Sequence, residues 1–264
     1  MQSNPEMPGL KELNLFDCCV TLGRFSSEIC LSSAAELIAH MDRYGITEAL
    51  VHDYHARVIH PLENGNRRVL EMIQGQPRLH AVWVLEPPLD PRAAAPLAAD
   101  LLSAGVNAAR LRIRSKGSLA WVWDDLLAAL EARRIPCFFD YGPMDSTLGD
   151  LSDQDLDALR DMVLAHPNLP VILSHVMGGL GVHPGVAYLL RRAPNLYLDI
   201  GGILEYWRET ARDLGAERVL FASGTPFTDA GILVSNLQYA RGFSLAEKQL
   251  MGGDNLRRLL GGAR

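Results

Sequence analysis

NAARLRIR (107–114), LAWVWDDLLAALEARR (119–134) and IPCFFDY (135–141) follow one another in the middle of the chain. The first and third segments are short runs typical of buried strands, whereas the second carries apolar residues at helical spacing. A strand, a helix and a second strand in this order form the repeating unit of a parallel sheet with helices packed outside it. The three segments therefore predict an α/β fold.

The same alternation runs along the rest of the chain. Strand-like runs are expected at 13–20, 48–54, 79–86, 107–114, 135–141, 169–175, 195–200 and 218–223. Helical spacing follows them at 33–46, 63–75, 90–105, 119–134, 152–166, 185–193, 204–215 and 229–242. Eight such units without a change in composition favour a closed (β/α)8 TIM barrel, with 1–264 as a single domain. We expect a short extension at 1–12, and at 244–264 a helix, a Gly-Gly break and a terminal helix.

Local signals agree with this division. A doubly wound sheet is the second choice of fold, but the segment after the first strand, VTLGRFSS (20–27), lacks the GxGxxG phosphate loop. Ser33 and Glu36 form the pattern of a capping box. Glycines that could adopt the left-handed conformation of a helix C-cap follow several helical runs, namely Gly45, Gly75, Gly105 and Gly215.

Composition narrows the class of protein. Of the 264 residues, 48% are hydrophobic and 21% charged, which excludes a disordered, collagen-like or coiled-coil chain. The net charge of −6 disfavours nucleic acid or an anionic membrane as a partner. The four cysteines, at 18, 19, 30 and 137, form no CxxC motif, and we see neither a signal peptide nor a transmembrane run. We expect a cytoplasmic protein that binds a small molecule. The sequence does not decide between a monomer and a homodimer.

The active site of a TIM barrel lies at the carboxyl ends of its strands. There, Arg110, Arg112 and Arg114 alternate with apolar residues, so the guanidinium groups should point into the barrel. We expect Arg110 to be deepest, with Asp17 as its partner, and Arg112 and Arg114 to hold a substrate anion. The alternative is an internal salt-bridge network with Glu86, Asp140 and Asp199. One face of the first strand should carry Asp17, Cys19 and Thr21.

Other strand ends supply further candidates. His175 is a candidate general base, and Asp140 either assists it or pairs with an arginine. Cys19 is a candidate for substrate contact, although a small buried filler is the better interpretation of a cysteine there. His55, in the loop after the second strand, and Tyr141 are expected to line the pocket.

Segments over nearly the whole chain carry a resemblance to a known family. They are FDCCVTLG (16–23), ELIAHMDRYGITEALV (36–51), HAVWVLEP (80–87), GVNAARLRI (105–113), HPNLPVILSHVMGG (166–179), PNLYLDIGG (194–202), ERVLFASGTPF (217–227) and EKQLMGGDNLRRLLG (247–261). In order and spacing they resemble the amidohydrolase-related family, which implies a TIM barrel and metal-dependent hydrolases or decarboxylases.

The departures from that family concern its metal ligands. Where the family usually has His-x-His, the first strand has Cys19 and Thr21. The usual histidine of the fifth strand is Asp140, and the usual aspartate of the eighth is Gly224, in SGTPF. Only the sixth-strand histidine, His175, matches. A catalytic zinc needs about three protein ligands, so we expect no metal cofactor. An unusual zinc site formed by Cys19, Asp140 and His175, with His55, is the alternative.

These observations predict a hydrolase that acts on a small carbonyl compound, such as an anionic amide, ester or lactone. In it, Arg112 and Arg114 would orient the substrate, and His175, assisted by Asp140, would activate water. Two alternatives remain. One is a degenerate barrel kept as a binding protein, with the two arginines locked to Asp140 or Asp199. The other is a decarboxylase of the same family.

Overall fold

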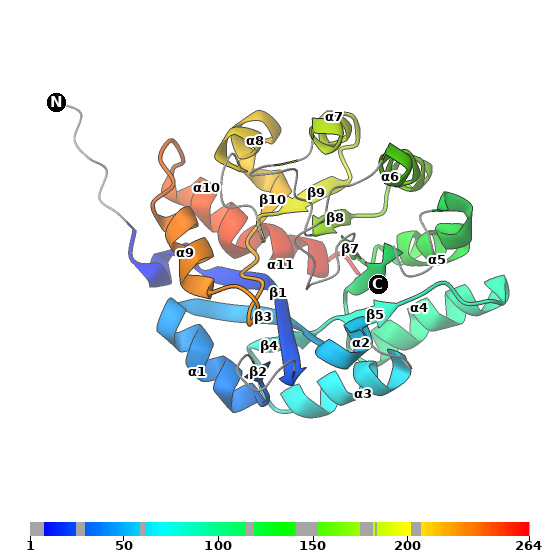
Figure 1. The fold of residues 1–264 in the computed structure, drawn as a ribbon, viewed down its shortest axis with the longest axis horizontal. Helices are drawn as coiled ribbons and strands as arrows, with labels where there is room; N and C mark the ends of the chain where they lie inside the picture. The colour runs from blue at the N-terminus through cyan, green and yellow to red at the C-terminus, as the bar shows by residue number, and fades with distance from the viewer. Residues whose placement is uncertain are drawn as a thin grey trace.

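The computed structural model describes residues 8–24, 30–58, 62–113, 119–140, 153–174, 182, 184–201 and 207–263. Parallel strands occupy the centre of this part of the chain, with helices around them (Figure 1). The barrel strands are β1 (Leu15–Arg24), β3 (Ile46–Asp53), β4 (Leu79–Ala81), β5 (Trp83–Leu85), β6 (Ala109–Arg112), β7 (Cys137–Asp140), β8 (Val171–Ser174), β9 (Leu196–Asp199) and β10 (Val219–Leu220). A two-residue strand, β2 (Cys30–Leu31), pairs antiparallel with the end of β1.

Hydrogen bonds close the strands into a barrel. Strands β4 and β5 are two halves of the third expected strand: β4 pairs with β3, β5 pairs with β6, and the Val82 amide between them donates to the Val51 carbonyl at 2.9 Å. Strand β1 meets the segment around β10, because the Cys18 amide donates to the Phe221 carbonyl at 3.0 Å. The expected (β/α)8 barrel is therefore confirmed.

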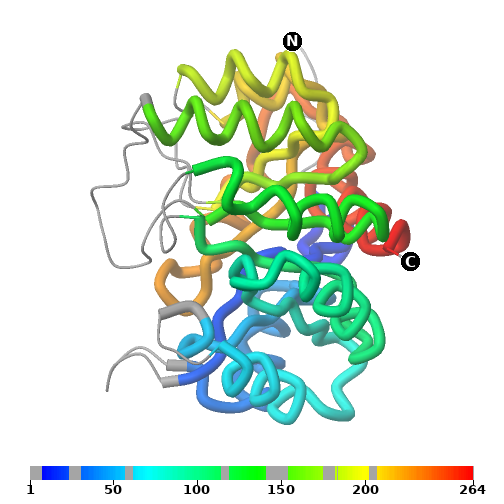
Figure 2. Tube along the Cα trace, turned by 90° about the vertical axis from the view of Figure 1, so that its right-hand side faces the viewer, coloured from blue at the N-terminus to red at the C-terminus, as the bar shows by residue number. Residues whose placement is uncertain are grey.

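Helices surround the barrel, most of them on its outer side (Figure 1). They are α1 (Ala34–Tyr44), α2 (Tyr54–Val58), α3 (Leu62–Ile73), α4 (Ala94–Ser103), α5 (Ala120–Ala132), α6 (Asp153–Ala165), α7 (Pro184–Arg192), α8 (Trp207–Leu214), α9 (Ala230–Gln238), α10 (Leu245–Gln249) and α11 (Asn255–Leu260). Figures 1 and 2 show α5, α6 and α7 side by side along one flank. Among the residues that the structure describes, no helix combines the length and apolar character needed to cross a bilayer.

The helix boundaries confirm most of the local signals. The four cap glycines all have positive φ, at 69° for Gly45, 76° for Gly75, 75° for Gly105 and 92° for Gly215. Ser33 caps α1 through its Oγ, which accepts from the Glu36 amide at 3.2 Å. The Glu36 carboxylate reaches one residue further back than a capping box requires, accepting from the Ser32 amide at 2.7 Å.

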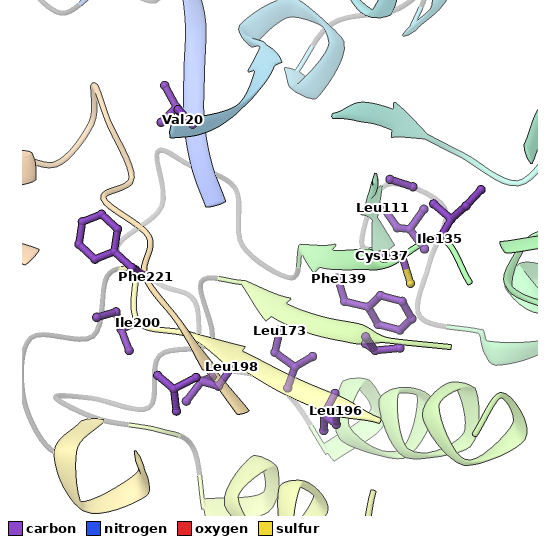
Figure 3. Close-up of a cluster of buried hydrophobic side chains, with 14 of the residues drawn as sticks. Val20, Leu111, Ile135, Cys137, Phe139, Leu173, Leu196, Leu198, Ile200 and Phe221 are labelled. Atoms are coloured by element: carbon purple, nitrogen blue, oxygen red, sulfur yellow. The ribbon is translucent and has the colours of Figure 1, made fainter. Parts of the chain in front are cut away.

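Apolar residues form two layers on opposite sides of the strands. The outer layer packs between strands and helices, and Figure 3 shows part of it: Val20, Leu111, Ile135, Cys137, Phe139, Leu173, Leu196, Leu198, Ile200 and Phe221. The inner layer fills the barrel with Phe16, Cys18, Cys19, Leu50, Val82, Ala108, Phe138, Ile172, Leu220 and Ala222. Since strand side chains alternate, an outward-facing layer on β6–β9 requires every second residue to point inward.

Strand β1 contains an irregularity near its start. The pairing of β1 with β3 changes register between Asp17 and Val20, which is the signature of a β-bulge. Cys18 and Cys19 consequently both pack in the inner layer. Simple alternation therefore does not hold between Asp17 and Cys19, because the extra residue interrupts it, although Asp17, Cys19 and Thr21 are all buried.

The Gly-Gly segment near the C-terminus is not a break. Gly252 and Gly253 lie in a π-helical turn, Leu250–Asp254, that joins α10 directly to α11. A Cβ built on Gly253 would lie 2.6 Å from the Asn14 carbonyl oxygen, just before β1. Helix α11 adds Leu256 and Leu259 to the inner layer. The glycines thus let the terminal segment close the amino end of the barrel.

We expect Gly253→Ala to lower the free energy of unfolding by about 1–3 kcal/mol, because the added methyl group would overlap backbone atoms. Urea unfolding followed by circular dichroism measures the change. Gly262→Ala is the control, since a Cβ there approaches the Leu259 carbonyl oxygen only to 3.4 Å. Equal losses in the two variants would contradict the importance of this close approach.

Candidate functional site

Five neighbouring strands place a polar residue at one level near their carboxyl ends. Arg112, Asp140 and Ser174 are paired in register on β6, β7 and β8. Glu86 follows β5 one residue beyond its last pair with β6, and Asp199 follows the last pair of β8 with β9 in the same way. We call these five residues the polar level. It lies at the end of the barrel where TIM-barrel active sites are found.

Arg110 lies one step deeper in the barrel and is fully buried. Its side chain crosses the interior, where Nη2 donates to the Cys18 carbonyl at 3.4 Å. Nη1 lies 3.6 Å from the Asp140 carboxylate, and the guanidinium lies 4.9 Å from the centroid of the Phe138 ring. Arg110 therefore lies deeper than Arg112, as expected, but its nearest carboxylate is that of Asp140 rather than Asp17. The register explains this, since Asp140 lies on the adjacent strand.

Two more buried carboxyl groups belong to this interior. Burial raises the pKa of Asp17 to about 6, against the lowering effect of hydrogen bonds from Ser223 and of the charge of Arg110. Burial likewise raises the pKa of Asp199 to about 6, although Ser174 Oγ donates a very short hydrogen bond to it and Arg110 attracts it. Both groups therefore take up protons in mildly acidic solution.

Arg112 and Glu86 form the more exposed end of the polar level. Arg112 Nη2 donates to the Glu86 carboxylate at 2.5 Å, and the two side chains are 12% and 10% exposed. The other members of the polar level are buried. Of the carboxylates considered as partners, Glu86 is the one that the structure pairs with Arg112 in an ion pair. This ion pair is the most exposed part of the polar level.

The structure describes the surroundings of two other predicted site residues, Cys19 and His55. Cys19 is 1% exposed and packs in the inner layer, which agrees with a small buried filler. His55 lies in α2 and not in a loop, because the Asp53 carboxylate accepts from its amide at 2.7 Å and caps the helix. Its ring lies 3.8 Å from the same carboxylate, which also binds Arg68. Substrate contact by Cys19 or His55 stays a prediction.

Three predicted site residues, His175, Arg114 and Tyr141, lie outside the described residues. Their roles also stay predictions.

Sequence reasoning missed a set of buried hydroxyl groups. Thr21 Oγ1 and His52 Nε2 lie 2.9 Å apart, and Ser223 Oγ donates to Thr225 Oγ1 at 2.7 Å. The Ser223 amide also donates to Asp17 at 2.9 Å. Strand-end position was the available signal, but alternation alone does not show which partners these hydroxyl groups have.

The described residues do not form a site for a divalent metal. They contain no group of three or more His, Cys, Asp or Glu side chains arranged to hold an ion. At the positions where the resembling family has ligands, Thr21 is bonded to His52, Gly224 has no side chain, and Asp140 lies beside a guanidinium. A cation that approached Asp140 would be repelled by Arg110.

Three solved structures show the same fold. An uncharacterised TIM-barrel protein of Bordetella bronchiseptica has a TM-score of 0.74 and 16% identity, covering 94% of this chain and 98% of that one. The 5-carboxyvanillate decarboxylase of Sphingomonas paucimobilis has a TM-score of 0.71 and 15% identity, covering 94% and 99%. A dihydroxybenzoic acid decarboxylase of a Polaromonas species, solved with bound manganese, has a TM-score of 0.68 and 17% identity, covering 94% and 97%.

The family of this chain follows from a comparison of its sequence with known families. No curated protein matches the chain. The protein-family model described as Amidohydrolase matches residues 34–262, which run from the start of α1 to just beyond α11. That match spans most of the 264 residues, and the barrel geometry agrees with it. The chain therefore belongs to the amidohydrolase family.

Proposed function

We propose that this chain is an enzyme that removes CO2 from a small carboxylate substrate at the carboxyl end of its barrel. The observation that carries this proposal is the Arg112–Glu86 ion pair. It lies at the partly exposed edge of the polar level, whose other members are buried. Members of the amidohydrolase family are hydrolases and decarboxylases. Two of the three similar structures described above are named as decarboxylases of hydroxylated or methoxylated benzoates.

Arg112 is suited to binding the substrate. A guanidinium group presents two parallel N–H donors, which match the two oxygens of a carboxylate or the oxygen of a developing enolate. Glu86 already accepts from Nη2 at 2.5 Å and so fixes the plane of the group. An anionic substrate would share the guanidinium with Glu86 or displace it. The low exposure of both side chains strengthens this electrostatic contact.

The buried carboxyl groups suit the chemical step. In non-oxidative decarboxylation the bond between carbon and carboxylate breaks, the electron pair stays on carbon, and CO2 leaves. A proton then takes the place of CO2 on that carbon. Asp17 and Asp199, each with a pKa of about 6, would keep protons in the site in mildly acidic solution. Arg112 would stabilise the negative charge that develops before the proton arrives.

Hydrolysis is the second candidate. His175 follows Ser174 of the polar level directly in sequence, and a neutral histidine at a strand end is a suitable base for water. The two reactions depend on pH in opposite directions, because decarboxylation here needs a protonated acid and hydrolysis needs a deprotonated base. A binding protein without turnover is the third candidate, and the existing pairing of Arg112 with Glu86 favours it.

We expect CO2 release from small hydroxybenzoates, with kcat/KM falling about tenfold per pH unit above pH ~6, as the acid loses its proton. Coupled detection of CO2 between pH 5 and pH 8 measures the profile. A parallel panel of small lactones, esters and amides is followed by acid release. Acid release that rises with pH would identify the hydrolase instead, and ligand-induced thermal stabilisation without any product would identify the binding protein.

We expect Arg112→Ala to reduce kcat/KM about 10²-fold, because the contact to the developing charge is lost. Arg92→Ala is the control, since Arg92 is an exposed residue paired with Asp90 and should leave the rate unchanged. Arg112→Ala leaves Glu86 without its cation, so the double variant Arg112→Ala/Glu86→Gln separates misfolding from loss of catalysis. Full activity in a folded Arg112→Ala variant would show that Arg112 does not bind substrate.

A further inference from the structure

Arg110 lies among three buried carboxyl groups. Asp140 is the nearest, at 3.6 Å, and Asp17 and Asp199 both interact electrostatically with the guanidinium. Asp17, Asp140 and Asp199 are 0%, 4% and 1% exposed. We call these three residues the carboxylate cluster. Ionised carboxylates in such surroundings are strongly destabilising unless a cation lies close to them.

The guanidinium acts in this cluster as a charge more than as a donor of hydrogen bonds. Among the residues that the structure describes, Nε and Nη1 of Arg110 have no hydrogen-bond partner, and Nη2 makes only the long contact to the Cys18 carbonyl. Burial lowers the pKa of Arg110, but Cys19, Asp140 and Asp199 raise it by more, so its pKa lies above the ordinary value. The group therefore keeps its charge in the barrel interior.

Within the described part of the chain, Arg112 cannot replace Arg110 in this role. Its guanidinium lies one level nearer the surface and is bonded to Glu86 at 2.5 Å. Among the described residues at the same end of the barrel, Thr21 and Gly224 stand where the resembling family has metal ligands, and neither offers a suitable ligand group. Within the described residues, the barrel interior thus combines three carboxyl groups and a fixed guanidinium with no group of side chains arranged to hold a metal.

We propose that Arg110 is a built-in cation that takes the electrostatic place of a divalent metal beneath this site, by neutralising the carboxylate cluster. Arg110 is fully buried and does not reach a substrate, so it is a positioning residue. A guanidinium supplies a permanent charge but has no open coordination position for water. The proposal does not depend on the reaction, because it concerns the charge balance of the folded protein.

The test uses Arg110→Met, which removes the charge and keeps an unbranched side chain. At pH 7.5 we expect its Tm to lie more than about 5 °C below that of the wild type, because the carboxylate cluster then lacks its cation. We also expect the variant to bind Mn²⁺ in a calorimetric titration, and Mn²⁺ to restore part of the lost Tm. The carboxylate cluster is not arranged to hold an ion beside Arg110, but it can move toward one once the guanidinium is gone. The wild-type Tm should respond neither to Mn²⁺ nor to a chelator.

Arg112→Met is the matched control, because it removes a cation from the same end of the barrel without uncovering the carboxylate cluster. It should gain no response to Mn²⁺. If Arg110→Met does not fold, Arg110→Met/Asp140→Asn should recover folded protein, since it removes one charge of each sign, whereas Asp140→Asn alone should not improve stability.

Two results would overturn the proposal. One is a stoichiometric divalent metal in the purified wild type whose removal lowers the Tm. The other is equal behaviour of Arg110→Met and Arg112→Met toward Mn²⁺. A folded Arg110→Lys variant that ignores Mn²⁺ would support the proposal, since it keeps the charge and changes the shape of the group.

Discussion

The contact between Arg110 and Asp140, 3.6 Å across neighbouring strands, is the constraint on which the interior of this barrel depends. Most TIM-barrel interiors are filled by apolar side chains in layers, and Phe138 and Ile172 fill this one in that way. Nearer the carboxyl ends of the strands the interior residues are charged. A buried charged group is stable only beside a group of opposite charge. The position of Arg110 thereby determines where carboxyl groups can be accommodated on β7, β9 and β1.

The fold could be predicted because its signal repeats. Each strand and helix boundary is weak evidence, but eight units in succession leave little choice of topology, and glycines such as Gly45 and Gly105 mark helix ends by a conformation that other residues avoid. The bulge in β1 and the π-helical turn could not be predicted, because each depends on contacts with residues distant in sequence. Gly253 is a glycine because Asn14 lies against it.

The site could be predicted only in its residue types. The arginine row and the strand-end carboxyl groups are visible in the sequence, and alternation correctly directs Arg110 into the barrel. The choice of partner is a question of register, because Arg112 lies beside Glu86 on one neighbouring strand and Asp140 on the other. A strand assignment with an error of one residue would place Arg112 on the other face of the sheet and beside neither partner. Family resemblance supplied the expected ligand positions, and physical contacts show what Thr21 and Asp140 do in place of the usual residues.

The terminal segment that closes the amino end of the barrel affects its electrostatics as well as its packing. Leu256 and Leu259 lie beneath the same inner layer that surrounds Arg110, with Phe16 and Leu50. By keeping bulk water out from below, this apolar plug lowers the local dielectric constant, and charges attract and repel more strongly in such a medium. The last turns of the chain therefore influence the acidity of groups at the opposite end of the barrel without touching them.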